Sequence, residues 1–225
     1  MYHWCTANQG GTLIWFSCRL MQRERSQNLT RSMLYSPCAL WQAHAEKRLQ
    51  ESSKELKLRI YQPKQVSPDA PQNQELEKLV GDVVRHSDEE DLYLRFFGFP
   101  DVEAIPARIT GRRLDRFETP RDLVIVACDQ DQAVGYADII EGLPGEQAGE
   151  ISMLVRSDRQ RQGIGETMFQ TAIEETRKKG IRHLKGYLLP GNYKMQRALK
   201  KWSEKLHVHV RKQWEAGELT YVVDV

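Results

Sequence analysis

Residues 149–165 have the sequence GEISMLVRSDRQRQGIG, and this stretch decides the fold. Its first part is mostly apolar as far as Val155, which is typical of a strand with buried side chains. The second part is polar and basic and ends in two glycines, Gly163 and Gly165. Apolar residues then recur at helical spacing until Gly180, a common residue just beyond a helix end. The stretch therefore predicts a strand, a glycine-containing turn and a helix.

A turn of this kind can hold an anion. Glycine lets the backbone approach a ligand closely, and the free N–H groups and positive dipole end of a helix favour negative charge. Arg156, Arg159 and Arg161 add positive charge around the predicted turn. A dinucleotide motif needs glycine or alanine where Met168 stands, and the G-K-[ST] of a P-loop is absent. The residues alone leave two interpretations open, a phosphate site for another ligand and a purely structural turn.

Upstream of this stretch, the chain predicts strands and helices in alternation. Residues 56–61 alternate in polarity like a half-buried strand, and residues 76–84 carry one apolar helical face. Ser87 and Glu90 fit a capping box that opens a second helix, which Gly98 would stop. In residues 101–117, Pro106 and Gly111 argue against one long helix, and the assignment stays ambiguous.

The remaining strands complete a mixed pattern. The continuous apolar run at 123–127 predicts a strand covered on both faces, followed by a polar turn at 128–132 and a returning strand at 133–140. Downstream of the helix we expect a strand at 181–188, a helix at 191–204 and closing strands at 206–211 and 218–224. This order predicts an α/β layered domain over residues 55–225.

Composition restricts the class of protein. The 225 residues are 40% hydrophobic, enough for one ordinary domain or two small ones. Lys plus Arg is 33 and Asp plus Glu is 31, so the net charge of +2 argues against nucleic acid as an obligatory partner. No apolar run approaches the roughly 20 residues that cross a bilayer, so we expect no membrane partner.

Residues 1–54 differ from the rest and are expected to form an N-terminal extension, poorly ordered or loosely packed. Glu24 is the only acidic residue among the first 45. One interpretation is an organellar transit peptide. The other is an extension without a targeting role, with translation beginning at Met21 or Met33.

The cysteines and histidines predict no metal site. Cys5, Cys18, Cys38 and Cys128 form no C-x-x-C pair, so we expect no disulfide framework and a reducing, cytoplasmic location. Cys128 has no identifiable histidine base, which argues against a nucleophilic role. His207 and His209 fall on one face of a predicted strand, but this spacing alone does not define a zinc site.

The motif Q-x-x-G-x-G at 160–165 follows a strand directly, and N-Y-K-M at 192–195 opens the next helix. Together they resemble the acyl-CoA site of the GNAT superfamily of N-acetyltransferases, and the resemblance covers residues 55–225. Segments 91–97, 149–165 and 180–192 are most similar to the acetyltransferase domains of bacterial protein lysine acetyltransferases.

The resemblance implies a mixed, mostly antiparallel central sheet that is splayed in the middle, with helices on both faces. It also implies acetyl-CoA as co-substrate and no metal. The free edge of the splayed strand would pair with the pantetheine arm, and the amides of the turn would hold the pyrophosphate. The residues expected to bind acetyl-CoA are Met153, Leu154, Val155, Gln160, Arg161, Gln162, Gly163, Ile164, Gly165, Glu166 and Asn192.

Catalysis requires a base, because an amine with a pKa near ~10.4 must lose a proton before it attacks. The resemblance places this base at Glu150, at the start of the splayed strand. The alternative is an ordinary solvent-facing glutamate at a strand entrance. Leu199 stands where many GNAT enzymes carry a tyrosine acid; Tyr193 is a candidate substitute, and the general acid stays unassigned.

The function expected from this resemblance is acetyl-CoA-dependent transfer of an acetyl group to a primary amine, by direct attack in a ternary complex. The expected acceptor is a protein lysine. Two alternatives stay open, a small-molecule amine acetyltransferase and a non-catalytic acyl-CoA-binding module.

Overall fold

A computed structural model of the protein describes residues 3–9, 12–18, 56–112, 121–142, 146–215 and 218–225. The chain forms two units, residues 1–48 and 49–225. In the first unit β1 (His3–Gln9) and β2 (Thr12–Cys18) pair as an antiparallel hairpin. The other residues of the expected extension, 1–54, lie outside the described residues.

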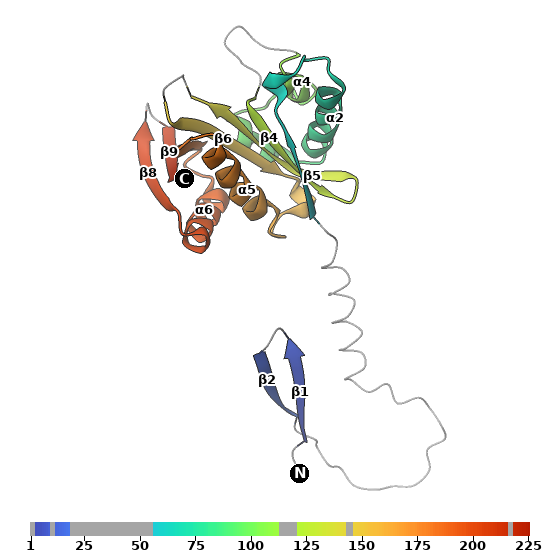
Figure 1. Ribbon diagram of the computed structural model, residues 1–225, viewed down its shortest axis with the longest axis vertical. Helices are drawn as coiled ribbons and strands as arrows, with labels where there is room; N and C mark the ends of the chain where they lie inside the picture. The colour runs from blue at the N-terminus through green and yellow to red at the C-terminus, as the bar shows by residue number, and fades with distance from the viewer. Residues whose placement is uncertain (1–2, 10–11, 19–55, 113–120, 143–145, 216–217) are drawn as a thin grey trace, which may run out of the picture. The chain divides into compact units, whose positions relative to one another are not determined.

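Within the described part of the second unit, seven strands form one sheet (Figure 1). Its spatial order is β3 (Leu56–Tyr61), β4 (Leu123–Asp129), β5 (Gln132–Glu141), β6 (Ala148–Val155), β7 (His183–Leu188), β9 (Glu218–Asp224) and β8 (His209–Glu215). Every neighbouring pair is antiparallel except β6 and β7, which are parallel. The predicted mixed, mostly antiparallel sheet is confirmed.

Helices cover both faces of this sheet. One hydrophobic cluster includes side chains of α2 (Pro71–Arg85), α3 (Glu89–Phe96) and α4 (Ile105–Thr110). The other includes side chains of α5 (Ile164–Lys178) and α6 (Tyr193–Leu206), which lie together across the sheet (Figure 1). None of the described helices has the length and apolar character needed to cross a membrane.

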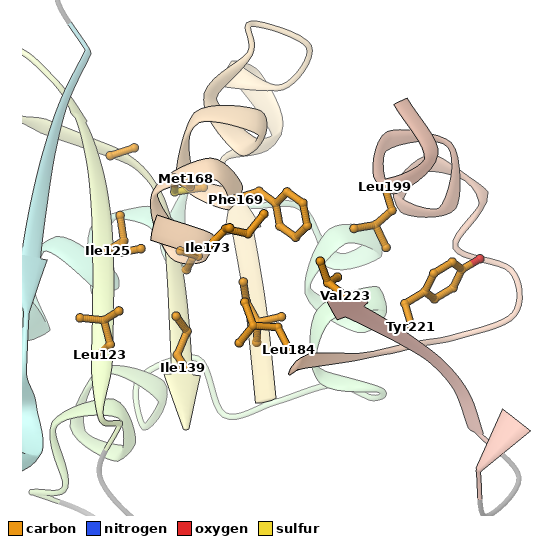
Figure 2. Close-up of a cluster of buried hydrophobic side chains, with 14 of the residues drawn as sticks. Leu123, Ile125, Ile139, Met168, Phe169, Ile173, Leu184, Leu199, Tyr221 and Val223 are labelled. Atoms are coloured by element: carbon orange, nitrogen blue, oxygen red, sulfur yellow. The ribbon is translucent and has the colours of Figure 1, made fainter. Parts of the chain in front are cut away.

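Strand β4 contributes side chains to both hydrophobic clusters, which explains its uninterrupted apolar sequence. All its residues are buried, and side chains alternate across a strand. Leu123 and Ile125 join the cluster under α5, whereas Val124 and Val126 join the cluster under α2. Figure 2 shows Leu123 and Ile125 near Ile139 of β5, with α5 above them. The sheet is therefore held between two cores.

The strands β6 and β7 part after three residues. Their parallel pairing runs only from Ala148 with His183 to Glu150 with Lys185. On its other edge, β6 stays paired with β5 as far as Val155. From Ile151 onward, no strand of the described residues pairs with this edge of β6, and the predicted splay is confirmed.

The N-terminus of α3 is not at the predicted position. The capping side chain belongs to Asp88, whose Oδ1 accepts a hydrogen bond from the Asp91 N–H at 2.9 Å. Ser87 instead donates from its hydroxyl to a carbonyl of the preceding helix. At the other end Phe97, with φ of 61°, ends α3 one residue before Gly98.

The chain after α6 also differs from the prediction. The helix continues to Leu206, and His207 ends it in the left-handed conformation, with φ of 53°. Strand β8 begins only at His209, so His207 and His209 do not share a strand face. The Nδ1 atom of His209 lies 2.9 Å from a carboxylate oxygen of Asp224 on β9. This histidine therefore supports the sheet edge.

The structure also corrects the predicted turn between β4 and β5 and assigns part of the segment at 101–117. Strand β4 extends to Asp129 and β5 begins at Gln132, so the polar turn is only two residues long. The ambiguous segment contains the short helix α4, and its last residues, 113–117, lie outside the described residues.

We expect Leu184→Ala to lower the free energy of unfolding by about 2–5 kcal/mol, the usual cost of emptying a large buried aliphatic site. Leu184 is fully buried on β7 and is paired with Gly149 at the closed end of the splay. Urea unfolding would measure the change. Lys200→Ala, on the exposed face of α6, is the control, and an equal loss in both variants would contradict the assignment.

Candidate active site

A cleft of about 880 Å³ lies where β6 and β7 part. Residues 150–155 of β6 and 186–188 of β7 line its two strand walls. The first part of α5, one side of α6, the end of α3 and part of β9 also line it. The absence of strand pairing beyond Glu150 has thus left room for a ligand of considerable size.

The cleft brings together residues that the sequence placed in three separate segments. Of the residues predicted to bind acetyl-CoA or to act as the base, only Gln162 does not line it; its side-chain oxygen accepts a hydrogen bond from Arg159 Nε at 3.2 Å. The candidates that line the cleft are Glu150, Met153, Leu154, Val155, Gln160, Arg161, Gly163, Ile164, Gly165, Glu166 and Asn192.

The turn before α5 presents backbone donors to the cleft. A short 3-10 helix (Ser157–Arg159) leads into it. Arg161 and Gly163 then adopt positive φ angles of 61° and 84°, which reverse the chain before α5 begins at Ile164. The first N–H groups of a helix have no partner within it, and this end carries partial positive charge. The turn has the geometry of an anion site.

Gly165 allows α6 to approach this turn closely. A Cβ atom at this position would lie 3.0 Å from Cη2 of Trp202 on α6, closer than a side chain tolerates without displacement. The Trp202 ring also contacts Phe169, with ring centroids 5.4 Å apart. Trp202 lines the cleft and was missed from the sequence, because nothing local connects it with the turn.

Most of the positive charge predicted around the turn is neutralised. Arg156 pairs with Asp158 at 2.9 Å, and Arg159 pairs with Asp129 at 2.5 Å. Among the described residues, Arg161 has no ion-pair partner. Of the three arginines, it alone offers an uncompensated charge to a ligand.

A buried carboxylate on α3 holds the turn in place. Asp91 Oδ2 accepts hydrogen bonds from Ser157 Oγ at 2.7 Å and from Gln160 Nε2 at 2.5 Å. Lys194 of α6 brings its Nζ within 3.8 Å of the other oxygen. Asp91 is only 8% exposed, so these partners satisfy a charge that water barely reaches. The sequence could not reveal this link, because its partners lie 66 and 69 positions away.

Glu150 is the last residue of β6 that pairs with β7, and its side chain is open to the cleft. Although water reaches the carboxylate, the protein around it removes enough solvation to raise its pKa. The positive charges of Arg121 and Arg95 oppose this rise, whereas the negative charges of Asp138 and Glu218 add to it. A carboxylate with a raised pKa is a stronger base than an ordinary glutamate.

A buried charge network underlies this part of the sheet. Asp138 is 2% exposed and lies 2.7 Å from Arg95 Nη2 and 2.8 Å from Arg121 Nε. The Ser152 hydroxyl donates to the same carboxylate at 2.9 Å. Burial raises the pKa of the adjacent Tyr136 to about 12, so this phenol stays neutral. The network fixes two positive charges near Glu150.

The candidates for a general acid occupy different surroundings. Leu199 is buried in the core, and Tyr193 is 66% exposed and does not line the cleft. Tyr187 and Tyr221 do line it.

Asn192 caps α6 by accepting a hydrogen bond from the Met195 N–H at 3.1 Å. Within the described ranges, no three His, Cys, Asp or Glu side chains gather as metal ligands would.

Comparison with known proteins identifies the class. A profile of the acetyltransferase (GNAT) family matches residues 87–202, more than half of the chain. The GNAT domain of PAT from S. lividans is 16% identical, with a TM-score of 0.55 over 76% of this chain and 90% of that one. An acetyltransferase from Thermus thermophilus is 20% identical, with a TM-score of 0.52 over 76% of this chain and 98% of that one. These structures share the fold of this chain.

The chain belongs to the GNAT family of acetyltransferases. It is therefore an acyltransferase enzyme, and the reaction of its class is acetyl-CoA-dependent acyl transfer.

We expect Asp91→Ala to lower the free energy of unfolding by about 1–3 kcal/mol, because Gln160 and Ser157 lose a buried partner. Thermal unfolding would measure this change. Glu89→Ala, an exposed position on the same helix, serves as the control. Equal melting temperatures for the two variants would show that Asp91 does not brace the turn.

Proposed function

We propose that the enzyme transfers the acetyl group of acetyl-CoA to a primary amine, most suitably a protein lysine, by direct attack in a ternary complex. The observation that supports this proposal best is the meeting of three parts in one cleft. These parts are the amide-rich turn at Gly163, the open edge of β6 and the carboxylate of Glu150.

The parts match the chemistry of the proposed co-substrate. The turn would bind the pyrophosphate through the backbone of residues 161–166, and Met153, Leu154 and Val155 would lie along the pantetheine arm. Gln160 would act indirectly, because its side chain is already bound to Asp91. Asn192 would hold the start of α6 against the same arm.

In the proposed reaction Glu150 takes a proton from the acceptor ammonium, directly or through a water. The amine nitrogen then attacks the thioester carbonyl, a C–N bond forms and the C–S bond breaks. The nitrogen loses its second proton to water, which leaves the neutral amide and the CoA thiolate. A thiol with a pKa near ~8.5 is a competent leaving group as the thiolate, so the step does not require a general acid.

The assignment of a protein lysine as the acceptor rests on sequence similarity to the bacterial protein lysine acetyltransferases. This similarity lies in segments 91–97, 149–165 and 180–192. The rival acceptor is a small free amine, and a comparison of kcat/KM for a lysine peptide and a polyamine separates the two. The third hypothesis, a non-catalytic acyl-CoA-binding module, requires tight CoA binding without turnover on any amine. A cytoplasmic location and a catalytic domain over residues 55–225 are part of the same proposal.

We expect Glu150→Gln to lower kcat by about 10²–10⁴-fold, the usual contribution of a general base. In the unmodified enzyme the carboxylate is the active form. Activity should therefore rise with pH through a pKa above the ordinary glutamate value of 4.5, because burial raises that pKa. Steady-state kinetics across pH would measure both effects.

The control for Glu150→Gln is Glu204→Gln, an exposed position on α6 outside the cleft. It removes the same charge and should leave kcat unchanged. Two results would rule out Glu150 as the base. One is a loss of kcat smaller than roughly tenfold in Glu150→Gln, and the other is a pH profile of this variant that still falls at acidic pH.

We expect Gly163→Ala to raise the Kd for CoA by about tenfold, because the turn amides move when alanine strains the positive φ. Gly180→Ala is a matched control. The two glycines flank opposite ends of α5, have φ of 84° and 77°, and have open space where a Cβ would lie.

Calorimetric titration with CoA would measure the effect. Both variants should lose similar stability, since left-handed alanine costs roughly 1–2 kcal/mol. If the two substitutions change the Kd equally, the turn does not bind the diphosphate.

A further inference from the structure

Charged side chains in the cleft wall fall into two groups. One group is already paired within the protein, for example Arg95 with Asp138 and Glu166 with Lys205. The other group has no ion-pair partner among the described residues. Its members are Glu150, Glu218, Arg161 and Lys201.

These four charges are separated by sign. Arg161 belongs to the turn before α5, and Lys201 is next to Trp202, which contacts that turn. The two carboxylates belong to the strands that line the cleft. Glu150 is where β6 and β7 part, roughly 17 Å along an extended strand from Val155. Glu218 begins β9, beside the end of β7, and its negative charge acts on Glu150.

The basic turn suits the phosphates of the co-substrate, which leaves the two carboxylates on the strands for the other reactant. Carboxylates that line one cleft repel each other, and a cation placed between them relieves that repulsion. Arg95 and Arg121 do not supply this cation at the surface, because both are bound to Asp138. Lys185, the register partner of Glu150, does not line the cleft and makes a contact of its own.

We propose that Glu218 is the acceptor-recognition residue, and that with Glu150 it binds the acceptor in its cationic ammonium form. This inference rests on the proposed function. The two carboxylates then have different tasks. Glu218 helps to bind the ammonium before transfer, whereas Glu150 then removes its proton. The site would favour a lysine side chain or a polyamine over amines that carry no positive charge.

The test uses the full chain with two acceptors, a lysine-containing peptide and hydroxylamine, which is uncharged at neutral pH. We expect Glu218→Gln to lower kcat/KM for the peptide by about tenfold, chiefly through KM, because the lost contact is one of binding. Activity on hydroxylamine and the Kd for CoA should stay unchanged. Glu218→Asp should recover most of the peptide activity.

Glu204→Gln again provides the control for net charge and should behave like the unmodified enzyme. Added salt should lower kcat/KM for the peptide more in the unmodified enzyme than in Glu218→Gln, because screening acts on the charge that the variant lacks.

Equal losses on both acceptors would assign Glu218 a structural role and overturn the inference. So would peptide kinetics unchanged from those of the unmodified enzyme. If the unmodified enzyme transfers acetyl to neither acceptor, the proposed function itself fails and the inference fails with it. These results are distinguishable, because only the last concerns the enzyme without substitutions.

Discussion

The interruption of one hydrogen-bond ladder determines the rest of the site. β6 and β7 are paired at only three positions, yet neither strand loses its support. β6 remains paired with β5 on one side, and β7 remains paired with β9 on the other. Both strands also anchor in the core under α5, where Leu184 lies near Val223 (Figure 2). Because each strand is held from its far side, the gap between them is a fixed feature of the fold.

The short helix α3 connects the two chemical ends of this gap. Asp91 and Arg95 are four residues apart, so they lie on the same face of the helix. Asp91 binds the turn before α5 through Gln160 and Ser157. Arg95 reaches Asp138 on β5 and Ser152 on β6, and Ser152 is two positions from Glu150 along the strand. A displacement of α3 would therefore disturb the proposed diphosphate site and the proposed base together.

Patterns local in the sequence predicted most of the fold, and contacts between distant residues explain the errors. The strand, turn and helix around Gly163 were predictable because periodicity and glycine positions specify them. Ser87 and Asp88 are both good caps, and a distant contact accompanies the choice of Asp88, whose N–H donates to Ser157 Oγ. Glu218 and Trp202 escaped notice for the same reason, since only the folded sheet places them in the cleft.

The buried network bears on the role proposed for Glu150 as a base. Arg95 and Arg121 carry two positive charges, and Asp138 compensates one of them. An ionised Glu150 compensates the second, so the group is neutral when the base is ready to accept a proton. Once Glu150 is protonated, the group carries an excess positive charge in surroundings that solvate it poorly. That excess favours release of the proton, while burial favours its capture. The loss of solvation outweighs the two arginine charges, so the pKa of Glu150 is raised.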